Sequence, residues 1–309
     1  MSGPYHIPVL RDVAVNFLVT APDGVYIDGT LGGGGHAEAI VEKLSPRGML
    51  VAIDADADAH RVAESRLKPF APRVVFVHDN NANIKSILQR LGLPAIHGLL
   101  LDLGVSSFQL DEGSKGFSYR SDDPLDMRMD RRRKLTAAEV VNTYPEEDLA
   151  TIFWRFGEER NSRKIARSIV ERRSTRKIET SGELAEIVSK HAPGSFPNKS
   201  LSRIFQALRI EVNDELSSLS RTLNDATDLL AAGGRIVVIS YHSLEDRIVK
   251  DFFRANSADS IPSGHKLVPD TPVTPRLRVL TKRPVTASGD EQKLNPRSRS
   301  AKMRAAEKA

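Results

Sequence analysis

The chain has 309 residues and a formal net charge of +5 at pH 7, and it contains no cysteine, which excludes disulfides, thiolate zinc sites and cysteine nucleophiles. No stretch reaches the ~18 uninterrupted apolar residues of a membrane helix. The first residues also lack the basic and apolar segments of a secretory signal. We therefore expect a cytoplasmic protein with no membrane partner.

Apolar runs alternate with amphipathic stretches in the first third of the chain. The runs expected to form buried parallel strands are Val25–Asp28, Met49–Asp54, Val74–His78 and Leu99–Asp102. The stretches with helical spacing are Ala37–Leu44, Asp56–Leu67 and Asn83–Leu91. This order predicts an α/β fold with a doubly wound parallel sheet and right-handed crossovers.

The alternation stops in the middle of the chain. Residues 111–203 are charged and helical without a convincing strand, which predicts an inserted all-helical domain between the two parts of the α/β domain, 1–110 and 204–309. The segments expected after it are one amphipathic helix from Leu201 to about Leu230, a strand over Arg235–Tyr241, a helix over Leu244–Phe253 and late strands within 274–284. Residues 256–264 and the last dozen or so have the composition of disordered segments.

A glycine-rich segment follows the first expected strand and enters a helix. It reads Asp28-Gly29-Thr30-Leu31-Gly32-Gly33-Gly34-Gly35-His36. Glycines permit positive φ and let a ligand approach the main chain, so this turn predicts a cofactor cradle. The segment satisfies the dinucleotide pattern G-x-G-x-x-G/A, with Asp54 farther along the chain, and a nicotinamide-dependent oxidoreductase therefore stays open.

Two features favour S-adenosylmethionine as the cofactor. Asp28 precedes the glycines, where a carboxylate suits a cationic ammonium group and opposes a pyrophosphate. The turn Ala232-Gly233-Gly234-Arg235 before a hydrophobic strand is common in methyltransferase folds. Asp54 is expected to bind ribose hydroxyls or to cap the next helix. Asp102 is expected to face the ligand cleft or to cap a turn, because an unpaired buried acid is costly.

Several motifs, spread in order over nearly the whole chain, resemble those of the MraW (RsmH) methyltransferases. They are the 28–36 segment, Leu101–Ser107, Gly116–Tyr119, Pro124–Asp130, Phe156–Arg160, Phe205–Ile210, Ser243–Arg247 and Asn295–Ser300. The resemblance implies a Rossmann-like class I sheet that binds S-adenosyl-L-methionine. It also implies methyl transfer to N4 of a cytosine in the decoding region of 16S ribosomal RNA, within the small ribosomal subunit. A non-catalytic ribosome-assembly factor that binds RNA is the alternative, and a homodimer is compatible with the sequence.

The resemblance also implies which residues contact the cofactor. The matching positions are Gly34, Gly35, His36, Asp54, Asp102 and Gln109, and we add Asp28, Gly32 and Asn81. The chain departs from the family pattern at 78–81, where an aromatic residue is frequent, at Phe108, where proline is frequent, and at 198–203, where a His-Pro pair is frequent. No adenine stacking and no histidine role are carried over to these positions.

The chemistry requires activation of a poor nucleophile, because the exocyclic amine of cytosine shares its lone pair with the ring. We expect Asp102, or a nearby main-chain carbonyl, to accept a hydrogen bond from that amine. His242 is expected either to relay a proton or to cap the following helix. Asp126 and Asp130 are expected to hold the insert against the cleft rather than to bind a metal, and no metal is expected.

Basic clusters predict a polyanionic partner, with a solvated surface as the alternative. The expected RNA contacts are Arg131, Arg132, Arg133, Arg160, Lys164, Arg167 and Arg209. The inserted helical domain is expected to recognise the RNA substrate through phosphate contacts, which position a nucleic acid without reading its sequence. A further basic cluster lies between Lys293 and Arg304.

Overall fold

The computed structural model describes residues 8–105, 115–191, 197–261, 263–265 and 269–309. The chain forms two compact units, one from residues 1–104 and 216–309 and the other from residues 105–215. The second unit is longer at both ends than the expected insert at 111–203. Gln109 and Phe108 lie outside the described residues.

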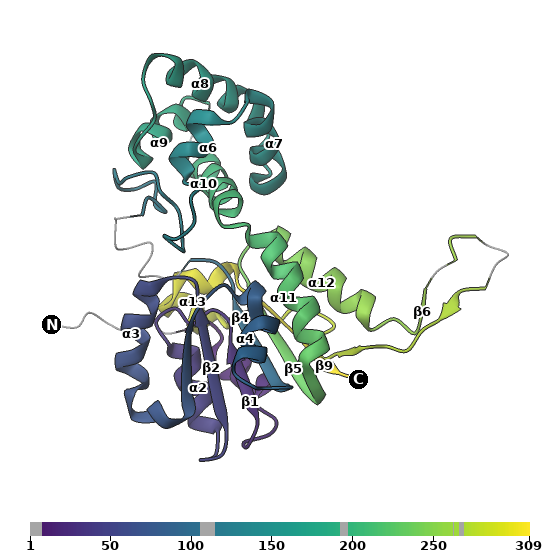
Figure 1. Ribbon diagram of the computed structural model, residues 1–309. Helices are drawn as coiled ribbons and strands as arrows, with labels where there is room; N and C mark the ends of the chain where they lie inside the picture. Colours follow the sequence, from purple (N-terminus) through teal and green to yellow (C-terminus); the bar gives the residue numbers. More distant parts are fainter. Residues whose placement is uncertain (1–7, 106–114, 192–196, 262, 266–268) are drawn as a thin grey trace. The chain divides into compact units, whose positions relative to one another are not determined.

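The first unit is built on a sheet in the order β3-β2-β1-β4-β5-β9-β8 (Figure 1). Its parallel strands are β1 (Val25–Asp28), β2 (Met49–Asp54), β3 (Val74–His78), β4 (Ile96–Asp102) and β5 (Leu230–Ser240). β9 (Lys302–Lys308) runs antiparallel to both of its neighbours, β5 and β8 (Leu277–Val279), so β8 has the same direction as the parallel strands. The chain runs outward from β1 through β2 to β3 and then crosses to β4 on the other side of β1, so the ligand crevice of such a sheet is expected at the carboxyl ends of β1 and β4.

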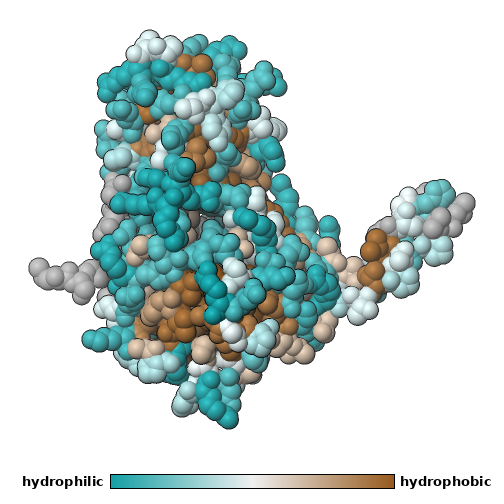
Figure 2. Space-filling view, viewed as in Figure 1, coloured by the Kyte–Doolittle hydropathy of each residue, from teal (hydrophilic) through white to brown (hydrophobic). Residues whose placement is uncertain are grey.

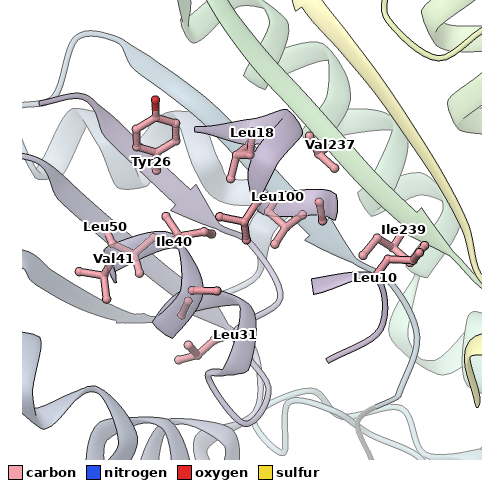
Figure 3. Packing of buried hydrophobic residues seen from close by; sticks show 14 of the residues in the cluster. Leu10, Leu18, Tyr26, Leu31, Ile40, Val41, Leu50, Leu100, Val237 and Ile239 are labelled. Carbon is pink, nitrogen blue, oxygen red and sulfur yellow. The ribbon is translucent and has the colours of Figure 1, made fainter. Parts of the chain in front are cut away.

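Helices cover both faces of this sheet. They are α1 (Arg11–Leu18), α2 (Gly35–Lys43), α3 (Ala57–Leu67), α4 (Ile84–Arg90), α11 (Glu215–Leu229), α12 (Ser243–Asn256) and α13 (Gly289–Leu294). Short 3₁₀ turns are η1 (Lys68–Arg73), η2 (Asn81–Asn83) and η3 (Pro296–Ser300). Alternate strand residues point to opposite faces, so Tyr26 and Leu100 pack on one side with α1 and α2 (Figure 3). Ile27 and Leu99 pack on the other side with α4 and α11.

The C-terminal strand β9 corrects the expectation of a disordered end. Met303 and Ala305 are completely buried, and β9 pairs with both β5 and β8. The sequence missed this strand because its small and charged residues have low β propensity. Arg304 does not join an exposed basic cluster, because it is buried and its guanidinium binds Asp246 (2.6 Å).

Two other expectations are revised in the second half of the chain. The amphipathic stretch expected as one helix from Leu201 to about Leu230 is two helices, α10 (Pro197–Asn213) and α11, because Asp214 takes a left-handed conformation (φ 52°) between them. The segment 256–264 is not wholly irregular, since β6 (Ser260–Ile261) pairs with β7 (Thr271–Pro272). The late strand expected within 274–284 is confirmed as β8.

The second unit is helical, as expected, apart from one isolated bridge between Pro124 and Thr180 in its described residues. Its helices are α6 (Ala137–Thr143), α7 (Glu146–Gly157), α8 (Ser162–Thr175), α9 (Ser181–Ser189) and α10. They enclose their own core, with Phe153 and Leu208 completely buried. Gly157 permits α7 to approach α10, because a Cβ there would lie 2.6 Å from the Arg203 carbonyl oxygen.

Hydrophilic residues cover most of the face that Figure 2 presents. Across the described ranges, no helix has both the length and the apolar character that a bilayer crossing demands.

Candidate active site

Three parallel strands of the first unit end in acids at the same edge of the sheet. These are Asp28 on β1, Asp54 on β2 and Asp102 on β4. Because β1 pairs with both β2 and β4, the three carboxyl groups lie at one edge, where the charges of Asp102 and Asp54 both act on Asp28. The glycine-rich segment continues directly from Asp28 at the end of β1, at the crevice where open α/β sheets bind ligands.

The glycine loop is held by Asp54. Its Oδ2 accepts a hydrogen bond from Gly32 N–H (2.8 Å), and its Oδ1 accepts one from Asp56 N–H (2.8 Å). Gly34 has a left-handed φ of 77°, and a Cβ there would lie 3.0 Å from the Cβ of Ala63. Open space beside Gly33, where an added Cβ would meet nothing within 4 Å, leaves the main chain accessible to a ligand. Burial raises the pKa of Asp54.

Asp54 does not cap the helix that follows it; the neighbouring Asp56 does. Asp56 is the N-cap of α3, where its side chain accepts a hydrogen bond from Asp58 N–H (3.0 Å). Asp54 therefore keeps acceptor capacity, because a carboxylate offers about four lone-pair sites and the two main-chain N–H groups occupy two.

Asp28 is completely buried, and only one of its carboxylate oxygens is satisfied. Oδ1 accepts a hydrogen bond from Thr30 N–H (3.1 Å), whereas Oδ2 has no hydrogen-bond partner among the described residues. Burial raises the pKa of Asp28 to about 6, an effect that the nearby His36 opposes. A buried orphan acceptor is rare, and a cationic ligand group beside it would supply the missing partner.

Asp102 is positioned by three neighbours. Tyr241 donates its hydroxyl hydrogen to Oδ1 (2.8 Å), His36 Nδ1 lies 3.5 Å from Oδ2, and Asp102 N–H donates to Thr30 Oγ1 (2.6 Å). Burial raises the pKa of Asp102 to about 7, and the hydrogen bond from Tyr241 limits that rise. The carboxyl group is nevertheless 23% exposed, so it combines a near-neutral pKa with access to solvent.

Tyr241 remains a hydrogen-bond donor over the whole physiological pH range, because burial and the charge of Asp102 raise its phenol pKa. The sequence did not indicate this hydrogen bond, because Tyr241 and Asp102 lie 139 positions apart in the chain. Thr30 and Glu245 were also not predicted as site residues. Glu245 accepts a hydrogen bond from Tyr241 N–H (2.9 Å) and thereby holds the start of α12 against the strand end.

Two histidines have structural partners here. His36 is buried in the first turn of α2 with Nε2 3.1 Å from the Val9 carbonyl oxygen, and burial lowers its pKa. His242 is the N-cap of α12, where Nδ1 accepts from Glu245 N–H (3.4 Å) and Nε2 lies 2.9 Å from Glu245 Oε1. The capping role is therefore present, and the proton relay stays a prediction, because Nε2 makes no hydrogen bond among the described residues.

Asn81, the first residue of η2 just after β3, holds the glycine loop in place. Its amide donates to the Gly29 carbonyl oxygen (3.0 Å), and its Oδ1 accepts from the Thr222 hydroxyl (2.9 Å). Thr222 lies on α11, far along the chain, which explains why no sequence pattern indicated the contact. Asn81 thus shapes the expected cofactor site by fixing the loop.

In the helical unit, several residues that were expected to form a site instead bind neighbouring residues. Arg209 is 14% exposed and forms a two-point ion pair with Glu215 (2.8 Å for both hydrogen bonds), so we remove it from the RNA contacts. Near it on α10, Asn213 donates to the Met127 carbonyl oxygen (2.8 Å) and accepts from Met129 N–H (2.9 Å). The paired acids do not form a metal site, since Asp126 binds Arg128 and Asp130 binds Arg132.

The other basic candidates remain on the surface. Arg131 and Arg132 are exposed, Arg133 is half-buried, and Arg167 lies 3.6 Å from Glu146. Arg160 and Lys164 are exposed and have no acidic partner within ion-pair distance in the described ranges. These two are the strongest of the predicted phosphate contacts, because no neighbouring carboxylate competes for them.

A Rossmann-like sheet with one reversed strand, β9, between β5 and β8, a glycine loop after β1 and acids ending β1, β2 and β4 defines a class I methyltransferase domain. Residues 4–309 match the sequence profile of the MraW methylase family, and the chain belongs to this family. A protein of Clostridioides difficile (strain 630) is 45% identical over 98% of this chain and 99% of its own length. One of Carboxydothermus hydrogenoformans is 48% identical over 98% and 97%. Both relatives are named ribosomal RNA small subunit methyltransferase H.

Proposed function

We propose that this methyltransferase transfers the methyl group of S-adenosyl-L-methionine to N4 of a cytosine in the decoding region of 16S ribosomal RNA. Family membership over almost the whole chain and the names of the relatives support an RNA of the small ribosomal subunit as the substrate. The observation that carries the chemistry is Asp102, an accessible carboxyl group with a pKa of about 7 beside the glycine loop.

The residues at the sheet edge fit the chemical groups of the cofactor. Asp28 Oδ2, which lacks a partner among the described residues, suits the ammonium group. Asp54 has lone pairs left for ribose hydroxyls, and the loop that contains Gly32, Gly34 and Gly35 leaves open space beside Gly33 for a ligand. When bound, S-adenosylmethionine supplies an electrophilic sulfonium methyl group. Gln109 remains an expected contact.

Asp102 acts on the nucleophile. Its carboxylate accepts a hydrogen bond from the exocyclic amine, which increases electron density on N4 and aligns the lone pair for in-line attack. In the transfer step the N4–carbon bond forms, the sulfur–carbon bond breaks, and its electron pair stays on sulfur. Asp102 then takes the proton that the methylated nitrogen releases and passes it to solvent. Holding the reactants in line contributes much of the rate, an effect that reaches ~7–11 kcal/mol in well-oriented reactions.

The helical unit supplies phosphate contacts. Arg160 and Lys164 are exposed and lack acidic partners in the described part of the chain, so they are free to bind the RNA backbone. The target base has to leave its stack before its amine meets Asp102, which costs a few kcal/mol in a helix and less in a loop. We place the reaction on the small subunit or an assembly intermediate in the cytoplasm.

One incubation tests the proposal. Purified protein, methyl-labelled S-adenosylmethionine and small subunits from cells that lack this activity are combined, and the RNA is digested to nucleosides. We expect label in N4-methylcytidine. Cofactor binding measured by calorimetry without label in any cytidine would refute the substrate assignment, and failure to bind the cofactor would refute the site. Light scattering of the same preparation tests the homodimer.

A further inference from the structure

The only tryptophan of the chain, Trp154, lies on the surface of the helical unit. It is 59% exposed, and it is the only large hydrophobic residue exposed to this degree within the described part of that unit. Tryptophan is enriched among the residues that carry most of the binding energy at interfaces.

The fold of the unit does not require this side chain. On α7 the core-facing positions are Leu149, Ile152, Phe153 and Gly157. Trp154 follows the buried Phe153 by one residue, which turns its side chain by about 100° around the helix and away from the core. Because its indole is left in solvent, Trp154 adds little to the stability of the unit.

Four exposed cations accompany Trp154 where α7 ends and α8 begins. They are Arg155, Arg160, Arg163 and Lys164. None has a carboxylate within ion-pair distance in the described ranges, in contrast to Arg167 on the next turn of α8, which lies 3.6 Å from Glu146. This set, Trp154 with its four cations, is called the Trp154 platform below.

The acids in the same segment do not neutralise the platform. Glu159 is 1% exposed and turns inward, where its Oε2 lies 3.7 Å from Arg203 and its Oε1 accepts a hydrogen bond from Asn161 N–H. Glu158 is the one exposed acid between Trp154 and Lys164. The exposed side chains of this segment therefore carry an excess of positive charge.

We propose that the Trp154 platform binds single-stranded RNA, with the indole stacked on an unpaired base and the four cations on flanking phosphates. Base stacking on an aromatic ring tolerates any sequence because every base has a π face, and cations nearby follow the backbone. A surface of this kind holds an unpaired strand through contacts that do not depend on base identity. The proposal rests on the proposed function, which supplies the RNA.

Charge favours RNA over a protein as the occupant. The centres of protein–protein interfaces are depleted of charged residues, and an unpaired charge buried there is costly. Four exposed cations that follow one exposed aromatic side chain within ten residues, and that have no carboxylate partner in the described ranges, match a polyanion that supplies phosphates at regular intervals. A protein that binds here instead is a distinct outcome of the test.

The single tryptophan makes the contact directly observable. An unlabelled single-stranded oligonucleotide with the decoding-region sequence is titrated into the full chain while indole fluorescence is recorded. A fully paired hairpin of the same length serves as the comparison. We expect saturable quenching by the single strand and weaker quenching by the hairpin. Saturating RNA that leaves the fluorescence unchanged, while anisotropy of a labelled strand shows binding, would overturn the proposal.

Variants separate stacking from charge. Trp154→Ala should weaken binding of a labelled single strand about 5- to 150-fold, Trp154→Phe should restore most of the affinity, and Leu91→Ala, an exposed leucine of the other unit, should change nothing. Replacing all four cations with glutamine should flatten the salt dependence of binding, because the slope decreases by about 0.7 for each phosphate that is no longer neutralised. Circular dichroism checks that each variant is folded.

The outcomes distinguish this inference from the proposed function. If Trp154→Ala binds and methylates RNA as the wild type does, the platform is refuted while the methyltransferase assignment stands. If the variant loses affinity for a small-subunit protein but not for the single strand, the surface is a protein interface and the inference is wrong. If the wild type methylates no RNA, the proposed function fails independently of Trp154.

Discussion

The hydroxyl of Tyr241 should set the pH at which the enzyme becomes active. Tyr241→Phe keeps the ring but removes the group that donates to Asp102 Oδ1 (2.8 Å). The ionised form of Asp102 loses a partner, while its protonated form loses much less. The pKa of Asp102, already raised to about 7 by burial, must therefore rise further.

The size of the shift follows from the strength of the hydrogen bond that is removed. A hydrogen bond to a charged group contributes about 1.5–3 kcal/mol, and one pKa unit corresponds to about 1.36 kcal/mol. The pKa of Asp102 should thus move from about 7 to about 8–9. Only the carboxylate accepts a hydrogen bond from the amine, so the rate rises with pH through this pKa. At pH 7 the ionised fraction falls from about one half to about 1–10%, which predicts a roughly 5- to 50-fold slower transfer.

The assay is the initial rate of methyl transfer to RNA from about pH 6 to about pH 10, at saturating cofactor and RNA. The wild type should show an acid limb near the pKa of Asp102, and Tyr241→Phe should show the same limb at higher pH with its rate recovered in alkaline buffer. Tyr26→Phe is the matched control, because it also removes the hydroxyl of a buried tyrosine, one that binds the main chain at Ala21. An unmoved limb in Tyr241→Phe, or an equal shift in the control, would refute the reasoning.

Three further predictions concern stability. Asp102→Asn should raise the free energy of unfolding at pH 8 by about 2–4 kcal/mol and slow the reaction. Burial raises the pKa of Asp102 from the ordinary 3.8 to about 7, so this carboxyl group destabilises the folded state increasingly as the pH rises between these two values. Urea unfolding should show no gain for the variant near pH 4, and an equal gain at both pH values would contradict this. Gly34→Ala should lose about 1–2 kcal/mol and cofactor affinity because of its left-handed φ, whereas Gly33→Ala, with open space at its Cβ, should unfold as the wild type does. Asp246→Ala should cost about 3–5 kcal/mol in thermal or urea unfolding, since it leaves the buried Arg304 unpaired; a loss below ~1 kcal/mol would show that solvent reaches Arg304.

The sheet and the edge that carries the site were predictable because their signals are local. Each of the first four strands is a short apolar run, and three of them end in an acid. Parallel strands place their carboxyl ends at one edge, so the proximity of Asp28, Asp54 and Asp102 followed from sequence order. The glycine loop was equally local, because positive φ at Gly34 is a property of one residue.

The functions of individual side chains were less predictable when two local roles competed. His242 had the position of both a proton relay and a helix cap; the structure shows the cap, through Nδ1 and Glu245 N–H, and leaves the relay a prediction. Arg209 belonged to a basic pattern that predicted RNA contacts, yet Glu215 occupies its guanidinium. Trp154 belongs to no motif, and only the packing of α7 shows that its side chain is exposed.

The sequence alone determined the α/β class, the helical insert, the family resemblance and the three strand-end acids, since each depends on periodicity or on residues close together in the chain. Tertiary structure decided that the last residues form β9, that the hydroxyl of Tyr241 binds Asp102, and that Asn81 meets Thr222. These contacts join residues up to 141 positions apart. Such pairs have no local pattern, because they are selected by the burial and hydrogen bonding of the whole folded chain.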